Sequence, residues 1–416
     1  MTMRLAGLLP LMLSFGSPVD ALELPYNSEL HGFVSQSYLI SPDNPYVGTS
    51  SDDGSFKFRE IGINGFTEFS TEFRVAGQVL SRYRDQADDG DLRVDFLLAD
   101  YQFFTNQYSA AGVRVGRVKN SIGFYNATRD IPSARPSFNV PESIYFEALR
   151  DTLLSTDGID LYGSALISGN QINWELTAGR KTVDSENFEY YAFAKPVPGT
   201  DKADVALRLF HVNVIPSFQK DLRLGLSIVD VDLDLKDPLS LQEAQMALVS
   251  APPGDLLLNP QNYVTGAGID GFLTLLSAQY SYRNWVITAE YFNLKNEFDG
   301  EFVGNAASSS ATTEAYFLQT EWFPSPTTSV FARYEELYLR RNDRSGDQTA
   351  ADYNPYRGFG RGWTLGSKWS FRENWSVSGQ ASFNEGTAWL PNFKGIENQD
   401  IKKHWNYYVF SLNYQF

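Results

Sequence analysis

The sequence contains no cysteine, no excess of basic charge and no long apolar run beyond its first residues. Without cysteine in 416 residues, disulfide bonds play no part in its stability. The 50 acidic residues against 34 basic ones give a net charge of −16, which argues against nucleic acid as a partner because such binders need a basic surface. No later segment offers 18 consecutive apolar residues, so no membrane-spanning helix is expected.

Histidine is also scarce, with only His31, His211 and His404 in the chain. A serine hydrolase needs a histidine beside its nucleophile. His31 and His404 stand at the starts of the terminal strands, and His211 shares the apolar parity of its strand, so all three are expected at rims or interfaces. No EF-hand or glycine-rich phosphate loop is present. We therefore expect no enzymatic activity, no cofactor and no metal site.

The first residues resemble an export signal. The stretch "MTMRLAGLLPLMLSFGSPVDALE" has an early charge at Arg4, an apolar run and small residues before Ala21. This order is typical of a secretory signal peptide. We expect residues 1–21 to be removed after export and residues 22–416 to form one domain.

Apolar and polar residues alternate through most of the remaining chain. In 72–84, "EFRVAGQVLSRYR", one parity is apolar and the other carries Glu72 and three arginines. This period of two indicates strands. It predicts sixteen strands, over residues 31–40, 55–65, 71–83, 92–104, 110–118, 158–167, 171–180, 204–215, 221–231, 271–282, 285–295, 313–323, 328–339, 361–371, 375–384 and 404–416.

The connections between these strands alternate in length. Short links such as "SGNQ" and "FREN" follow long ones, the latter at 41–54, 84–91, 119–157, 181–203, 232–270, 296–312, 340–360 and 385–403. A β-sandwich gives no reason for this rhythm, whereas an antiparallel up-and-down barrel in an outer membrane has tight turns at one end and long loops at the other. We therefore predict an all-β transmembrane barrel.

The C-terminal stretch "HWNYYVFSLNYQF" places five apolar residues on one parity, ending at Phe416. Lipid can bury that stripe, and an open sheet edge is not tolerated in lipid, so the last strand must pair with the first. A lumen enclosed by sixteen strands is too wide for side chains to fill and would hold water.

Over the mature length the chain resembles the sixteen-stranded bacterial outer-membrane porin superfamily, through "YYVFSLNYQF", the hairpin rhythm and one long loop after the fifth strand. The stretch "VGRVKNSIGFYNATRDIPSARPSF" is most similar to the phosphate-selective group. The resemblance implies an outer-membrane location in a Gram-negative cell, recognition of Phe416 by the outer-membrane assembly machinery, and a homotrimer. It also implies a channel for passive diffusion of small hydrophilic solutes or ions.

The long segment 119–157 is the candidate constriction loop. It is dense in aromatic residues, which favours a packed loop folded into the barrel over a lid across its mouth. The porin family has Pro-Glu-Phe-Gly at the loop tip, where this sequence has "VPESIYFE", so no acidic residue is transferred from that motif. The charged candidates are Arg129, Asp130, Arg135, Glu142, Glu147, Arg150 and Asp151.

Arginines on the lumen parity of the neighbouring strands form a predicted basic wall. Its members are Arg74, Arg82, Arg93 and Arg114, with Arg84 and Arg117 at strand ends. Such a wall predicts weak anion selectivity. Alternatively these residues are solvated and paired with Glu72 and Asp95. The inward set also includes Arg208, Arg223, Arg333 and Lys368, opposed by Glu175, Glu290, Glu321 and Glu335. Lysine is too scarce here for the lysine clusters of phosphate channels.

A plugged or adhesive barrel without an open pore is the alternative function. The segment 232–270 contains "PLSLQEAQMAL", which predicts a short helix begun at Asp237 or Ser240. That helix could cap the mouth or lie on the surface of an outer loop.

Overall fold

The computed structural model describes residues 27–46, 48, 52–85, 88–186, 189, 193, 195–347, 355–390 and 401–416. The expected signal peptide, residues 1–21, lies outside these ranges. The predicted sixteen strands are all present, with bounds β1 Asn27–Ile40, β2 Ser55–Glu68, β3 Phe73–Arg84, β4 Asp89–Thr105, β5 Ser109–Lys119, β6 Ser155–Ile167, β7 Asn170–Asp184, β8 Lys202–Ile215, β9 Leu222–Leu235, β10 Val264–Tyr282, β11 Trp285–Phe302, β12 Asn305–Ser325, β13 Thr328–Tyr338, β14 Phe359–Arg372, β15 Trp375–Gly386 and β16 His404–Gln415.

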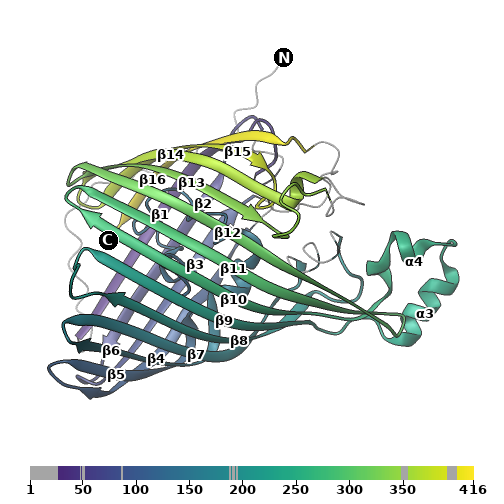
Figure 1. Ribbon diagram of the computed structural model, residues 1–416, viewed down its shortest axis with the longest axis horizontal. Helices are drawn as coiled ribbons and strands as arrows, with labels where there is room; N and C mark the ends of the chain where they lie inside the picture. Colours follow the sequence, from purple (N-terminus) through teal and green to yellow (C-terminus); the bar gives the residue numbers. More distant parts are fainter. Residues whose placement is uncertain are drawn as a thin grey trace.

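The strands form one closed antiparallel barrel in which each strand pairs with its neighbour in sequence (Figure 1). Closure runs through β1 and β16, in a register that pairs Phe33 with Gln415 and Leu39 with Val409. At the end of this seam, the backbones of Gly32 and Phe416 exchange two hydrogen bonds of 3.0 Å. The predicted barrel and its closure are confirmed.

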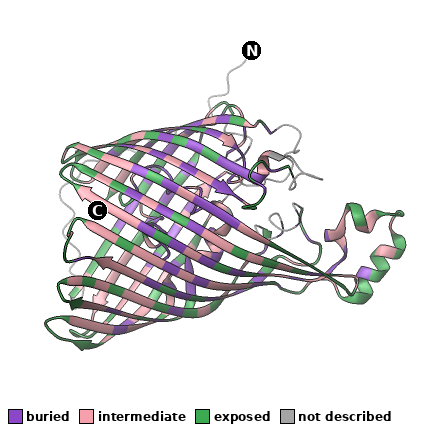
Figure 2. Ribbon diagram, viewed as in Figure 1, coloured by how far each residue is buried: buried purple, intermediate pink, exposed green. Residues whose placement is uncertain are grey.

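Exposure alternates along the strands, as Figure 2 shows by colour. On β14, Trp363 is 54% exposed on the outer face, while its neighbour Thr364 is 3% exposed on the inner face. Large apolar side chains such as Leu276, Leu318 and Phe410 are likewise exposed on the outside. An apolar belt of this extent requires lipid, because soluble monomers do not expose such surfaces.

Several predicted loops lose residues to the neighbouring strands, and two of them lose the most. Residues 296–312 form the end of a long hairpin, since β11 reaches Phe302 and β12 starts at Asn305. The turn residues Val303 and Gly304 have φ of 51° and 80°, the two positive values of a type I′ turn, which follows the strand twist. Residues 232–270 also lose their ends to β9 and β10.

These extensions build an arm that projects from the long-loop end of the barrel, with α3 (Leu241–Ser250) and α4 (Asp255–Leu258) at its tip (Figure 1). Ser240 is the N-cap of α3 and forms a capping box with Glu243, which satisfies orphan backbone donors of the first turn. The predicted helix start at Ser240 is confirmed. The helix lies on the arm, away from the barrel body (Figure 1).

The remaining short helical elements are η2 Asn126–Thr128, η3 Glu147–Leu149, α1 Arg150–Leu153, η4 Pro260–Tyr263 and η5 Pro355–Gly358. Among the described residues, no helix has the length and apolar character needed to cross a membrane.

Candidate channel interior

The connection between β5 and β6, residues 120–154, is here called the lumen loop. Its two ends are tied together, because the Asn120 amide donates to the Leu154 carbonyl at 3.0 Å and the Asn120 side chain bonds Leu153 and Thr156. Asn126 donates back to the carbonyls of Asn120 and Leu153. These bonds hold the start and the end of the loop together at the barrel wall, and they are here called the neck.

The lumen loop is bonded to inward-facing side chains of strands around the barrel. Its backbone amides at Gly123, Phe138 and Ser143 donate to Ser227 on β9, Gln380 on β15 and Glu335 on β13, respectively, at 2.9–3.0 Å. The hydroxyl of Tyr145 donates to Glu290 on β11 at 2.6 Å. Since these strands lie far apart around the closed sheet, the loop lies inside the barrel.

Aromatic and aliphatic side chains of the loop pack against the inner wall. The ring of Phe138 lies 4.5 Å from that of Phe58 on β2, centre to centre, at an interplanar angle of 60°, and the ring of Tyr125 lies 6.1 Å from that of Phe317 on β12. Both loop residues are under 8% exposed. Burying one such aromatic side chain contributes about 1.5–3 kcal/mol. The apolar residues that suggested a packed loop are therefore the ones that hold it in the lumen.

Glu147 is the centre of a basic cluster between the loop and β3. Its carboxylate accepts hydrogen bonds from Arg82 and from Arg84 at 2.7 Å, and Arg129 and Arg150 lie within 4.0 Å. Burial alone would raise the pKa of this carboxyl, but the surrounding guanidinium groups outweigh it and hold the pKa well below its usual range. Two predicted wall arginines thus clamp the loop.

Asp130 holds the other side of the same cluster. It bonds Arg150 at 2.7 Å, a pair with side chains 2% and 1% exposed, and Lys119 at 3.2 Å. Burial again opposes ionisation, yet the charges of Arg150 and Lys119 keep the pKa of Asp130 well below its ordinary value. Asp151, in contrast, is 43% exposed and bonds Arg150 from the water side at 3.0 Å.

Glu142 has a different environment. It accepts from Tyr46 and, at 2.9 Å, from Tyr407 on β16. Burial and the nearby charge of Glu335 raise the pKa of Glu142 to about 7, and the two phenol hydrogen bonds only partly offset them. Arg135, the last charged candidate in the loop, pairs with Glu60 on β2, with one contact at 3.3 Å.

The wall arginines of β3 and β5 are paired with acids that lie behind them. Arg74 bonds Asp100 at 2.9 Å, with side chains 45% and 3% exposed. Arg114 bonds Asp160 at 2.9 Å, with side chains 24% and 1% exposed, and its guanidinium covers the ring of Tyr162. The lumen surface here presents guanidinium groups while the carboxylates are shielded.

The other predicted wall residues are also paired. Arg117 forms a two-point ion pair with Asp157 at 2.6 and 2.8 Å. It shares the parity of Val115 and pairs with Leu97, both exposed on the outer face, so its prediction as a lumen residue is wrong. Arg93 shares Asp88 with Arg82. The partners anticipated from the sequence are not these. Glu72 bonds Ser70 in a turn, and Asp95 is held by Gln78 and Lys119.

Arg208 does not face the lumen, contrary to prediction. It is on the outer face of β8, 64% exposed, where it bonds Asp230 at 2.5 Å. The inner parity of β8 carries Val205, Leu207 and Leu209, all under 4% exposed. In this part of the wall the inner face is apolar, so the rule of polar inside and apolar outside is inverted.

The same inversion places His211 inside the barrel. It is 3% exposed, and its Nδ1 and Nε2 lie 2.8 and 2.7 Å from Ser227 Oγ and Asn213 Nδ2. The expectation of a rim or interfacial residue is wrong for His211. Ser227, at 1% exposed, also accepts the Gly123 amide, so this Ser–His–Asn chain anchors the loop.

Within the described ranges, no group of three or more His, Cys, Asp or Glu side chains has an arrangement that could hold a metal ion.

No protein-family model and no curated protein matches the sequence. Solved structures match over 94% of the chain: OmpT, an outer membrane protein of Vibrio cholerae (TM-score 0.54, 13% identity, 97% of that chain), an anion-selective porin from Comamonas acidovorans (0.52, 12%, 99%) and OmpF of Salmonella typhi (0.50, 12%, 97%). The chain has an outer-membrane porin-type fold. At these identities the likeness concerns the fold alone.

Within this porin-type fold, several interior residues were missed by sequence reasoning. Tyr46, Glu60, Gln380 and Tyr407 all bond the lumen loop. Only Glu60 carried a usable signal, as a charged residue on the parity opposite Ile61 and Ile63. The others are hydroxyl or amide groups, which occur equally on solvated surfaces.

Proposed function

We propose that this protein is an outer-membrane porin, a water-filled channel through which small hydrophilic solutes diffuse passively. The observation that carries the proposal is a closed sixteen-stranded barrel with a loop folded into its lumen. A lumen of this size is wider than side chains can fill, and a loop within it narrows the path without closing the wall.

The solute path we propose runs between the lumen loop and the wall formed by β3 to β7. The hydrogen bonds described above fasten the loop to β2, β9, β11, β13, β15 and β16. The loop also bonds Arg82 and Arg84 near the end of β3 and Lys119 at the end of β5, so the path passes the parts of these strands around Arg74 and Arg114. On the β3–β7 side, inward-facing wall residues retain exposure: 45% for Arg74, 24% for Arg114 and 23% for Glu175. On this path the exposed members of the predicted set, Arg74, Arg114 and Asp151, would line the constriction, while the buried members hold the loop in place.

Weak anion selectivity is the finer proposal. Arg74 and Arg114 are more exposed to the lumen than their partners Asp100 and Asp160, so a passing ion meets the guanidinium groups first. Because each arginine is paired, the net field is small and the preference is weak.

The proposed location is the outer membrane of a Gram-negative cell, reached after export and cleavage of the signal peptide. The assembly machinery would recognise Phe416, and three copies would assemble as a trimer. The apolar outer face, with Leu276, Leu318 and Phe410 exposed, supports contact with lipid.

Planar-bilayer recording of the purified mature protein tests the channel and its selectivity. Steady ohmic current steps are expected, and the reversal potential in a KCl gradient should favour chloride. Arg74→Ala and Arg114→Ala should each shift that potential toward potassium. Arg208→Ala is the matched control, because it removes an arginine from the outer face and should leave the potential unchanged. A wild-type reversal potential that favours potassium would refute the anion preference.

A plugged or adhesive barrel is the second candidate, and one observation favours it. The apolar contacts of the lumen loop reach both sides of the lumen, from Phe58 on β2 to Phe317 on β12. If folded protein with heat-modifiable gel mobility gives no current steps, this function replaces the open porin.

A further inference from the structure

The inner wall of β9, β10 and β11 is apolar toward the long-loop end of the barrel. The side chains that face inward there are Val231 and Leu233 on β9, Ile269 and Leu273 on β10, and Phe292 and Leu294 on β11. A water-filled barrel is expected to have polar side chains at such positions. This stretch of wall is therefore suited to an apolar partner.

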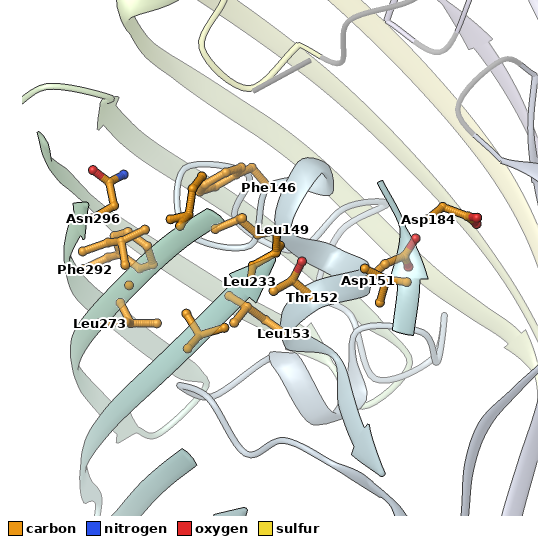
Figure 3. Close-up of a pocket in the computed structure, with 15 residues that line it drawn as sticks. Phe146, Leu149, Asp151, Thr152, Leu153, Asp184, Leu233, Leu273, Phe292 and Asn296 are labelled. Atoms are coloured by element: carbon orange, nitrogen blue, oxygen red, sulfur yellow. The ribbon is translucent and has the colours of Figure 1, made fainter. Parts of the chain in front are cut away.

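The lumen loop supplies the opposite side of a hollow. Phe146, Leu149 and Leu153 face the apolar wall across it, as Figure 3 shows. The open volume is about 880 Å³, counting the solvent in its mouth. As a closed cavity the hollow measures only about 70 Å³, several times the space that one water molecule needs, about 10–15 Å³. It therefore takes a small ring or a short alkyl chain, while the rest of a ligand stays in the open mouth.

Gly271 leaves room at the centre of the apolar wall. A Cβ at this position would lie 2.9 Å from Cγ1 of Val231 and 3.3 Å from Cδ1 of Leu294. Any side chain would therefore crowd the wall and enter the hollow. Nearby Leu273 and Phe292 are each 1% exposed, so the floor is firmly packed.

The charged residues that line the hollow are both acidic and lie at its rim. Asp151 and Asp184 stand together at one end, with Asn296 at the other (Figure 3). Asp151 is 43% exposed, and its partner Arg150 is also engaged by buried Asp130. Asp184 is 74% exposed and its ion pair with Lys202 lies in water, where such pairs are weak. The rim thus attracts a cation.

We propose that this hollow is a binding site for a small amphipathic cation, with its aromatic ring or alkyl chain against the β9–β11 wall and its ammonium group at Asp151 and Asp184. This binding goes beyond passive diffusion of hydrophilic solutes. It requires the loop and the wall but no ion flow, so it stands or falls separately from channel activity.

Fluorine NMR tests the proposal with 4-(trifluoromethyl)benzylamine and the full barrel in lipid nanodiscs. Leu294→Trp fills the hollow and should weaken binding at least tenfold. Leu276→Trp, on the lipid-facing side of β10 and 51% exposed, is the matched control and should bind as the wild type does. Equal binding by all three proteins would show that the signal comes from lipid, and the site would be refuted.

Charge and folding are controlled separately. 4-(Trifluoromethyl)benzoate should bind at least fivefold more weakly than the amine, and Asp151→Asn should reduce that difference. An anion bound as tightly as the amine overturns the proposed ligand class.

Val231→Thr controls for folding. It keeps the side-chain size and replaces a methyl group by a hydroxyl, so the variant should still fold and should bind the amine several-fold more weakly. If the Val231→Thr variant is folded, and both it and the Leu294→Trp variant bind the amine as the wild type does, the site is refuted. Binding without current steps would refute only the porin function.

Discussion

The guanidinium of Arg135 and the carboxylate of Glu60 form an ion pair inside the barrel, with side chains 8% and 4% exposed. The pair joins the lumen loop to β2, two segments that are 75 residues apart in sequence. Removing one member of a buried pair leaves an uncompensated charge and costs about 3–5 kcal/mol, whereas replacing both by apolar groups is often neutral.

Glu60→Gln should therefore lower the free energy of unfolding by about 3 kcal/mol. The double variant Glu60→Leu with Arg135→Met should lie much closer to the wild type. Urea unfolding in detergent micelles measures all three. If the single and double variants lose the same stability, the pair is not the source of the effect.

The stability of the protein should depend on pH through Glu142. Its pKa rises from 4.5 to about 7 on folding, so the folded chain binds a proton that the unfolded chain has released. The free energy of unfolding should accordingly fall as the pH rises from 4.5 through about 7, by about 2 kcal/mol given the partial exposure of the group.

Urea titrations at pH 5 and pH 8 measure this difference, and Glu142→Gln should reduce it by about 2 kcal/mol. Asp130 and Glu147 do not confuse the result, because their pKa values are held low and both stay ionised throughout. An identical pH dependence in Glu142→Gln would assign the effect to another group.

Shortening the lumen loop should enlarge the channel. Replacing residues 124–150 by a short Gly-Ser linker keeps Asn120 and Leu154, which tie the neck. Single-channel conductance should rise by about twofold or more, since the loop would no longer occupy the lumen. Unchanged conductance in a folded variant would mean that the narrowest point lies elsewhere.

The closure seam should be sensitive to the volume at Gly32. A Cβ there would lie 2.7 Å from Cε1 of the Phe416 ring, so Gly32→Val should reduce the folded fraction on refolding. Adding Phe416→Ala should restore it, as judged by heat-modifiable gel mobility. A double variant no better than Gly32→Val would place the conflict at the backbone of Gly62 instead.

Phe416→Ala alone separates folding from assembly. In vitro refolding should be nearly normal, because the seam hydrogen bonds are made by the backbone. In cells, the amount of barrel in the outer membrane should fall several-fold if the assembly machinery reads this side chain. Phe410→Ala is the control, because Phe410 lies on the same strand and is 63% exposed.

The strands and their closure could be predicted because lipid requires each strand to alternate outward apolar side chains with inward polar ones. This alternation does not hold where the inner wall packs against protein. Arg208 was placed inward because it is charged, but the neighbouring inner wall packs against protein. The hairpin at 296–312 was missed because "NAASSSATT" has no apolar alternation; its strand structure comes from pairing with β11.

The loop was predicted as a packed segment from its composition, yet its partners could not be. Phe138 and Gln380 are 242 residues apart, and nothing local marks either as a partner of the other. Charge gave partial guidance: Arg82, Glu147 and Arg150 do meet. That these three residues pair with one another is known only from the three-dimensional structure.

The hydrogen bonds of the lumen loop also define an order of assembly. The loop is bonded to Glu60, made before it, and to Gln380 and Tyr407, made long after it. The backbone amide of Phe138 and the carboxyl of Glu142 therefore gain these partners only when the last two strands are in place. A chain that stalls before β15 and β16 join the sheet leaves both groups without them, so the loop itself registers whether the barrel is finished.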